Sequence, residues 1–224
     1  FDAEWLTQGT DAHLRRQFVQ AALSNMVGGI GHFHGRGLEQ IKPGISPRET
    51  PARSLLTAVP SRSFFPRGFL WDEGFHQHLV SVWDSDLSRD ILASWAGLIE
   101  DSGWLPREQI LGEEARDRVP EQFRVQKPTI ANPPTQVLAV HTMLRRLAES
   151  VGTGAGGEAT AQREHEMKQM TLFLQQVLPA YQRYVGWFLR SQTSVTSDTF
   201  SWTECGGSDH CLPSGLDDYP RAPY

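Results

Sequence analysis

Cysteine is scarce in this sequence, and long runs of apolar residues are absent. The two cysteines, Cys205 and Cys211, are too few for a disulfide framework. No stretch approaches the roughly 20 apolar residues that cross a bilayer, so no membrane-spanning segment is predicted. The first residues, Phe1 to Trp5, lack the basic and apolar regions of a signal peptide and also lack an initiating methionine. We therefore expect an interior segment of a longer chain.

Positive charge is also in short supply. The 21 Lys and Arg residues face 26 Asp and Glu residues, which gives a formal net charge of −5. This balance argues against a nucleic-acid-binding protein, because such a protein offers a basic face to phosphates. The chain is instead rich in Arg, with 7 Trp and 11 Phe. These planar groups can hydrogen-bond to sugars and stack on them, although a GC-rich gene and an aromatic core account for the same composition.

The sequence lacks the usual motifs for zinc binding, for a serine hydrolase and for phosphate binding. The eight His residues show no helical zinc-binding spacing, and G-x-S-x-G is absent, so neither a metal nor a cofactor is predicted. The glycines of residues 28–31 follow a helix rather than a strand, which argues against a phosphate-binding loop. His210 lies between the two cysteines, but a small disulfide loop or two free thiols explain that pair better than a metal site.

Apolar residues recur every three or four positions along much of the chain, which predicts an all-α fold. Pro179 lies inside one of these patterns, so we expect a kink or break near Gln176–Leu178. No two strand patterns pair convincingly. Long helices would pack as antiparallel hairpins, with long ordered loops, and hence any site, at one end. The predicted helices cover residues 13–27, 74–84, 86–100, 135–149 and 160–190.

The segments between the helices differ in composition. Residues 28–73 are dense in Gly, Pro and aromatic residues, and residues 101–134 form a second long stretch with little periodicity. A structureless stretch of this length is usually functional or disordered, and its aromatic, Arg and Pro content favours an ordered, functional loop. Residues 151–158 are glycine-rich, which predicts a flexible loop. Residues 192–224 are polar and irregular.

Three groups of residues could carry chemistry. In the first, Arg67 and an aromatic wall precede Trp71, Asp72 and Glu73 at the start of a helix. A carboxylate there is ordinarily a helix cap, but a carboxylate, an Arg and an aromatic platform together are what a sugar ring needs.

The second group runs from Gly103 to Gln136. Its charged residues 113–118 could form a solvated ion-pair cluster, whereas Arg124 and Asn132 are flanked by prolines that hold a loop stiffly. The third group contains Asp217 and Asp218 after a Gly. Such a pair can form an Asx turn or a helix cap, or one carboxylate can raise the pKa of the other, which suits a general acid.

Four segments, in the same order, resemble glycoside hydrolase family 63, the family of processing α-glucosidases. The resemblance extends from about residue 1 to 221 and is weakest over residues 192–213. It implies that residues 1–224 are the N-terminal part of an (α/α)₆ toroid, here truncated. It also implies hydrolysis of the terminal α-1,2-linked glucose of Glc₃Man₉GlcNAc₂ N-glycans with inversion. The segments are FFPRGFLWDEGFHQ (64–77), GWLPREQILGEEAR (103–116), NPPTQ (132–136) and SGLDDYPR (214–221).

The resemblance also implies roles for individual residues. An inverting glycosidase needs an acid and a base carboxylate ~6.5–9.5 Å apart. The acid corresponds to Asp217, with Asp218 as the alternative, because related trehalases carry one Asp in this element. Trp71 and Asp72 correspond to the subsite for the departing glucose. Substrate binding is also implied for Arg67, Arg124 and Asn132.

One departure from the family pattern limits the expected activity. The general base of the family is a Glu far downstream of the acid, and this sequence does not contain it. The family's membrane anchor and β-sandwich domain also lie outside it. We therefore expect a fragment of an endoplasmic reticulum membrane protein that acts in the lumen on nascent glycoproteins, and no hydrolysis by the fragment alone. The alternatives are a carbohydrate-binding remnant and a non-catalytic all-α interaction domain.

Overall fold

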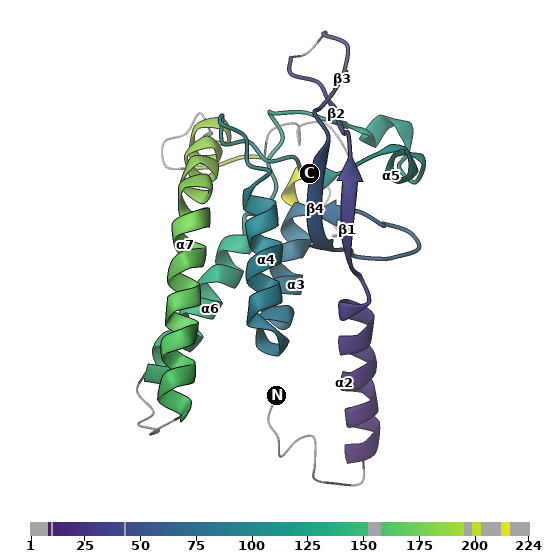
Figure 1. The fold of residues 1–224 in the computed structure, drawn as a ribbon. Coiled ribbons are helices and arrows are strands. Elements are labelled where there is room, and N and C mark those ends of the chain that lie inside the picture. The colour runs from purple at the N-terminus through teal and green to yellow at the C-terminus, as the bar shows by residue number, and fades with distance from the viewer. Residues whose placement is uncertain are drawn as a thin grey trace.

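The computed structural model describes residues 9, 11–42, 44–151, 158–194, 199–202 and 212–215. Within these ranges the chain forms six α-helices, seven short strands and two 3₁₀ turns (Figure 1). The helices are α2 (Ala12–Val27), α3 (Leu70–Trp83), α4 (Ser85–Ala96), α5 (Glu113–Asp117), α6 (Thr135–Val151) and α7 (Glu158–Ser191). The strands are β1 (Ile30–Gly35), β2 (Leu38–Glu39), β3 (Arg48–Glu49), β4 (Arg53–Ala58), β5 (Gly68–Phe69), β6 (Glu108–Gln109) and β7 (Val125–Gln126). The 3₁₀ turns are Glu121–Phe123 and Leu212–Ser214.

The periodicity of apolar residues located the long helices correctly. Helices α2, α3, α4, α6 and α7 fall on the five predicted ranges, although α4 ends earlier, at Ala96. The expected break near Pro179 does not occur, because α7 continues through it as one helix of 34 residues. Buried side chains on both sides of Pro179, among them Val177 and Tyr181, anchor the two halves to the core and keep the helix continuous.

The structure is mainly helical, as expected, but short strands also pair, so the expectation that no strands would pair was wrong. Strands β1 and β4 pair antiparallel over six residues, from Ile30 opposite Ala58 to Gly35 opposite Arg53. Smaller ladders join β2 to β3 and β7, and β5 to β6. The β1–β4 pair could not be predicted from the sequence, because 17 residues, rich in Gly and Pro, separate the two strands. No tight-turn signal therefore marks the connection.

The core lies where α4 meets β4 and the other long helices. Helix α3 packs against α4 and α6, α4 packs on β4, and α7 packs on α4 and α6 (Figure 1). Trp95 and Leu92 of α4 and Leu55 of β4 are completely buried in this core. Helix α2 stands apart from the other helices in Figure 1, and its apolar residues Leu14 and Phe18 are mostly exposed. The glycine-rich residues 152–157 and the final Asp217–Asp218 pair lie outside the described residues.

Candidate active site

The candidate site is built on the first turn of α3. Strand β5 pairs with β6 and runs directly into this helix, and the N–H of Leu70 donates to the carbonyl of Arg107 at 2.9 Å. Asp72 and Glu73 occupy the first helical turn, where the helix dipole favours negative charge. The Trp71 ring lies edge-on to the ring of Phe75, with centroids 5.2 Å apart. Trp71 and Asp72 are both half-buried.

Asn132 connects this turn to two other segments. Its side chain is completely buried, and its Oδ1 accepts a hydrogen bond from the N–H of Trp71 at 3.2 Å. Its Nδ2 donates to the carbonyl of Pro213 at 3.1 Å. Its own carbonyl accepts from the hydroxyl of Tyr184 at 3.0 Å. Burial raises the pKa of Tyr184, so the hydroxyl stays neutral and keeps its proton to donate.

Thr135 and Gln136, which follow Asn132 in the NPPTQ segment, form further hydrogen bonds to α3 and α7. The Thr135 hydroxyl donates to the carbonyl of Trp71. A Cβ at position 74 would lie well under 3.0 Å from Thr135, so only Gly74 permits this approach of α3 to α6. The Gln136 side-chain oxygen accepts from the hydroxyl of Tyr181 at 3.1 Å. One short segment therefore connects the Trp71 turn of α3 to α7.

The C-terminal described residues lie on the Trp71 side chain. Gly215 has a φ of +72°, and a Cβ there would stand 2.8 Å from the indole Cε2 of Trp71. Gly215 is the second residue of the SGLDDYPR segment, so this segment begins against the Trp71 ring. Asp217 and Asp218, further along it, lie outside the described residues, and the assignment of a general acid there stays a prediction.

Glu73 lies on the buried side of the same helical turn. Its carboxylate accepts hydrogen bonds from the Thr57 hydroxyl, from the N–H of Ala58 at 3.1 Å, from the indole N–H of Trp95 at 3.0 Å and from the Gln77 amide at 2.5 Å. Burial raises the pKa of Glu73 to about 7, although the hydrogen bonds to the charged form oppose this shift. The sequence pattern suggested only a possible helix cap.

Arg67 forms a buried ion pair just before β5. Its Nε and Nη2 contact the Glu108 carboxylate at 2.8 and 2.6 Å, and Arg107 binds the other carboxylate oxygen. The guanidinium carbon stands 4.6 Å from the centre of the Phe69 ring. The Arg67 Nη1 is buried without a hydrogen-bond partner. The structure thus surrounds Arg67 with protein groups, and its predicted substrate contact is untested.

Arg124 is half-buried in a different loop. Its Nε donates to the carbonyl of Val119 at 2.8 Å. Arg124 immediately precedes β7, and the Gln126 side-chain oxygen accepts from the N–H of Glu108 at 3.1 Å. Among the predicted site residues, the structure brings Trp71 and Asn132 into direct contact, and Asp72 follows Trp71 in the chain. The substrate-binding role of Arg124 stays a prediction.

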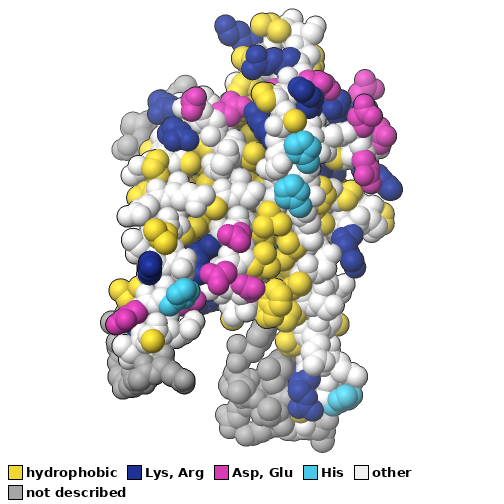
Figure 2. Space-filling model, in the orientation of Figure 1, with side chains coloured by type: hydrophobic (Ala, Val, Ile, Leu, Met, Phe, Trp, Pro, Cys, Tyr) yellow, Lys and Arg dark blue, Asp and Glu magenta, His cyan; other side chains and the backbone are white. Residues whose placement is uncertain are grey.

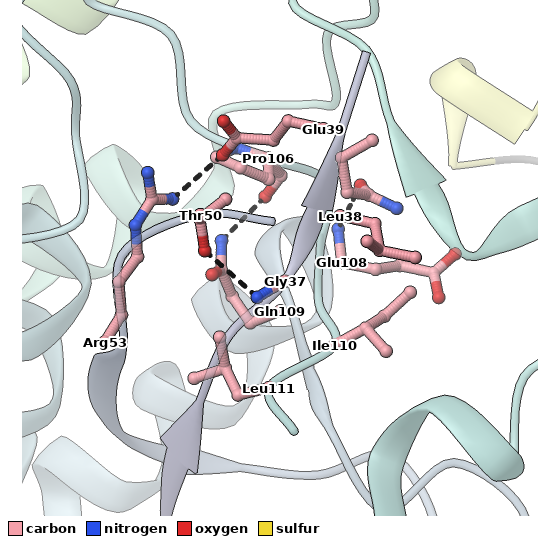
Figure 3. Close-up of a pocket in the computed structure, with 11 residues that line it drawn as sticks. Gly37, Leu38, Glu39, Thr50, Arg53, Pro106, Glu108, Gln109, Ile110 and Leu111 are labelled. Atoms are coloured by element: carbon pink, nitrogen blue, oxygen red, sulfur yellow. Dashed lines mark hydrogen bonds and ion pairs between the residues drawn. The ribbon is translucent and has the colours of Figure 1, made fainter. Parts of the chain in front are cut away.

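The strand ends near β6 enclose only a small pocket (Figure 3). The volume available there is about 10 Å³, enough for one water rather than a sugar. Its polar groups bind one another: Glu39 pairs with Arg53 at 3.2 Å, and Gln109 donates to the carbonyl of Pro106 at 3.1 Å. Figure 3 also shows the Glu108 carboxylate directed away from this pocket. This pocket is therefore too small to hold a sugar ring, and its polar side chains hydrogen-bond to the protein itself.

A larger cleft of about 520 Å³ lies between β1 and α5. Histidine side chains gather over β1 and acidic side chains over α5 in Figure 2, and His32, His34, Glu113 and Glu114 line the cleft. These four side chains are exposed. Within the described ranges, no group of three or more His, Cys, Asp or Glu residues is arranged to hold a metal ion. No helix in these ranges is both long enough and apolar enough to cross a membrane.

Comparison with known proteins places this scaffold among the glycosyl hydrolases. Residues 1–224 match the family model described as the glycosyl hydrolase family 63 C-terminal domain. The chain belongs to glycosyl hydrolase family 63. The mannosyl-oligosaccharide glucosidase of Saccharomyces cerevisiae (strain ATCC 204508 / S288c) is 38% identical over 93% of this chain, which spans 30% of that protein.

Two further relatives give the same result. The probable mannosyl-oligosaccharide glucosidase of Schizosaccharomyces pombe (strain 972 / ATCC 24843) is 37% identical over 92% of this chain and 31% of its own length. The mannosyl-oligosaccharide glucosidase GCS1 of Arabidopsis thaliana is 38% identical over 92% of this chain and 24% of its own length. The chain thus spans less than a third of each of these three relatives.

Proposed function

We propose that the full-length protein containing this chain is a mannosyl-oligosaccharide glucosidase. It hydrolyses the terminal α-1,2-linked glucose of the Glc₃Man₉GlcNAc₂ N-glycan on nascent glycoproteins, with inversion at the anomeric carbon. The observation that carries the proposal is the family match over the whole chain, together with relatives bearing this name at 37–38% identity. The family resemblance of the four motifs supports the choice of linkage.

The proposed mechanism divides the work between two carboxyl groups. Asp217 protonates the leaving glycosidic oxygen, and a Glu further along the full-length chain removes a proton from the attacking water. Asp218 is the alternative acid. Trp71 offers its ring to the departing glucose, and Asp72 and Arg124 bind the glucose hydroxyls. The contact of Gly215 with the Trp71 ring supports this scheme, because it brings the segment that contains Asp217 to the proposed sugar-binding residue Trp71.

Asn132 has a supporting role in this proposal. Both polar atoms of its amide bind backbone groups, and its side chain is 0% exposed. Asn132 therefore contributes to substrate binding through the position of Trp71. Arg67, paired with Glu108, supports the loop that leads into α3.

We also propose where the full-length protein acts and what the isolated polypeptide can do. The full-length protein acts in the lumen of the endoplasmic reticulum and is anchored in its membrane, as the family resemblance implies. The 224-residue polypeptide alone carries the sugar-binding turn but not the proposed base. We expect it to bind glucose-like ligands without hydrolysing the glycan.

The test is glucose release by the full-length protein from Glc₃Man₉GlcNAc₂, with the configuration of the first glucose followed by NMR. We expect β-glucose to appear first, because inversion of an α-linkage yields the β-anomer. A glycan lacking the outermost glucose is the matched control and should release none. The proposal is wrong if the full-length protein releases no glucose, or if α-glucose appears first.

A further inference from the structure

Glu73 is a buried carboxylate that joins three elements of the fold. Its Oε2 accepts from the Thr57 hydroxyl and the Ala58 N–H of β4 and from the Trp95 indole of α4. Its Oε1 accepts from Gln77, one turn along α3. The side chain is 0% exposed. All four donors are neutral groups, so this carboxylate serves to connect the elements by directed hydrogen bonds rather than by charge pairing.

The hydrogen bonds of Glu73 also hold the turn that carries the two predicted sugar-binding residues. It directly follows Trp71 and Asp72, and all three residues belong to the first turn of α3. Asn132 and Thr135 hold the backbone N–H and carbonyl of Trp71 on the side of α6. Glu73 holds the same turn on the side of β4 and α4. The turn is therefore fixed between two opposing sets of hydrogen bonds.

We infer that Glu73 is a positioning residue that sets the placement of Trp71 and Asp72 for binding glucose. This role rests on the proposed glucosidase function. Glu73 touches no sugar, and it acts by holding the backbone from which the sugar-binding side chains project. A displacement of about 1 Å in such a group can lower an enzyme's rate about 100-fold.

The hydrogen bonds also indicate which substitution preserves the arrangement. In Glu73→Leu, the Ala58 N–H, the Thr57 hydroxyl and the Trp95 N–H lose a common acceptor at a fully buried position. In Glu73→Gln, the amide oxygen can take the place of Oε2. Its amide nitrogen then takes the place of Oε1. The Gln77 amide, whose nitrogen donates to Oε1 in the wild type, turns over so that its own oxygen accepts from the new amide nitrogen. Glutamine therefore keeps the connections and removes only the charge.

The experiment uses the full-length enzyme and 1-deoxynojirimycin, an iminosugar with the shape of glucose that occupies only the glucose subsite. We expect Glu73→Leu to raise the inhibition constant and lower kcat/KM by about 10- to 100-fold. Glu73→Gln should recover most of this loss. Val177→Ala, a buried change in α7, is the control for a general loss of stability and should leave the inhibition constant unchanged. The inhibition constant reports only the folded molecules, so partial unfolding does not alter it.

Three results would overturn the inference. The first is a folded Glu73→Leu enzyme with the inhibition constant and kcat/KM of the wild type. The second is an equal loss in Glu73→Leu and Glu73→Gln, since the hydrogen bonds would then not be what matters. If Glu73→Leu fails to fold, Thr57→Val is the substitute. It removes one donor to Glu73 and one of the two acceptors of the Trp95 N–H, which keeps Glu73 as its other acceptor. It should raise the inhibition constant about threefold, and an unchanged inhibition constant is the third result that would overturn the inference. A wild-type enzyme that releases no glucose and binds no iminosugar refutes the proposed function, and this inference with it.

Discussion

The two faces of α3 reverse the usual arrangement of a helix on a core. The buried face carries Glu73, Gln77 and Ser81 among its residues. The opposite face carries Phe75, Leu79, Val82 and Trp83, each at least half exposed. Surface helices normally bury the apolar stripe and expose the polar one. Glu73 faces inward and connects β4 and α4 to the turn that holds Trp71 and Asp72. Further along the helix, the Ser81 hydroxyl accepts from Arg146 of α6.

The largest effect is expected at Gly74, where α3 approaches α6 most closely. Gly74→Ala would place a Cβ well under 3.0 Å from Thr135, and overpacking of this kind costs about 3 kcal/mol. Gly97→Ala is the matched control, because the Cβ there meets its nearest atom at 3.4 Å. Thermal unfolding of the two full-length variants measures the difference. Equal midpoints would mean that α3 and α6 can separate without cost.

The next effect concerns the pH dependence of the buried face. The pKa of Glu73 rises from 4.5 in the unfolded chain to about 7 in the folded protein. The folded state therefore holds more protons between these values, and stability falls as the pH rises through this range. Relative to Glu73→Gln, the wild type should lose on the order of 3 kcal/mol between pH 4.5 and pH 7. Denaturant midpoints at several pH values measure this loss, and a constant difference would contradict the pKa shift.

A smaller effect is expected at Asn132, which holds the turn from the other side. Asn132→Leu leaves the Trp71 N–H and the Pro213 carbonyl without partners and should cost about 2 kcal/mol. Glucose release should fall about 10-fold, because the Trp71 ring loses its support. Gln192→Leu removes another buried amide, whose Nε2 donates to Thr129 at 3.1 Å, and should destabilise without lowering kcat. Equal losses of activity would show that Asn132 acts only through stability.

The smallest effect tests the outer face of α3. Leu79→Ala should change the free energy of unfolding by no more than about 0.5 kcal/mol if this face meets solvent. Val80→Ala, one residue along on the buried face, should cost about 2 kcal/mol. Urea unfolding of both variants gives the comparison. A Leu79 variant as unstable as the Val80 variant would show that another part of the full-length protein covers the outer face.

The same helix shows how far the sequence can predict the structure. Residues of one kind recur every three or four positions on both faces of α3, polar residues on one face and apolar residues on the other. The periodicity therefore located the helix but did not show which face is buried. Glu73 and Gln77, at i and i+4, mark the buried polar face only once the partners on β4 and α4 are known. The β1–β4 pair was missed because the long loop between the strands gives no turn signal. Contacts between distant segments decide both features.

In the candidate site, too, the sequence predicted individual residues but not the contacts between them. The motifs predicted Trp71, Asp72 and Asn132 as site residues, and the structure joins Trp71 to Asn132 by a hydrogen bond. The connecting role of Asn132 could not be predicted, because it depends on Pro213, 81 residues away. Likewise, nothing local in the sequence indicates that Arg67 pairs with Glu108, since only the pairing of β5 with β6 brings the two side chains together.

The most direct test is the Asp217→Asn variant of the full-length enzyme, assayed for glucose release from Glc₃Man₉GlcNAc₂. An amide keeps the shape of the acid but cannot protonate the leaving oxygen, so we expect kcat to fall about 10²- to 10⁴-fold. The affinity for 1-deoxynojirimycin should stay close to that of the wild type, because Trp71 and Asp72 are intact. Wild-type turnover by Asp217→Asn would contradict the account. If Asp218→Asn were then inactive, the acid would be Asp218 instead.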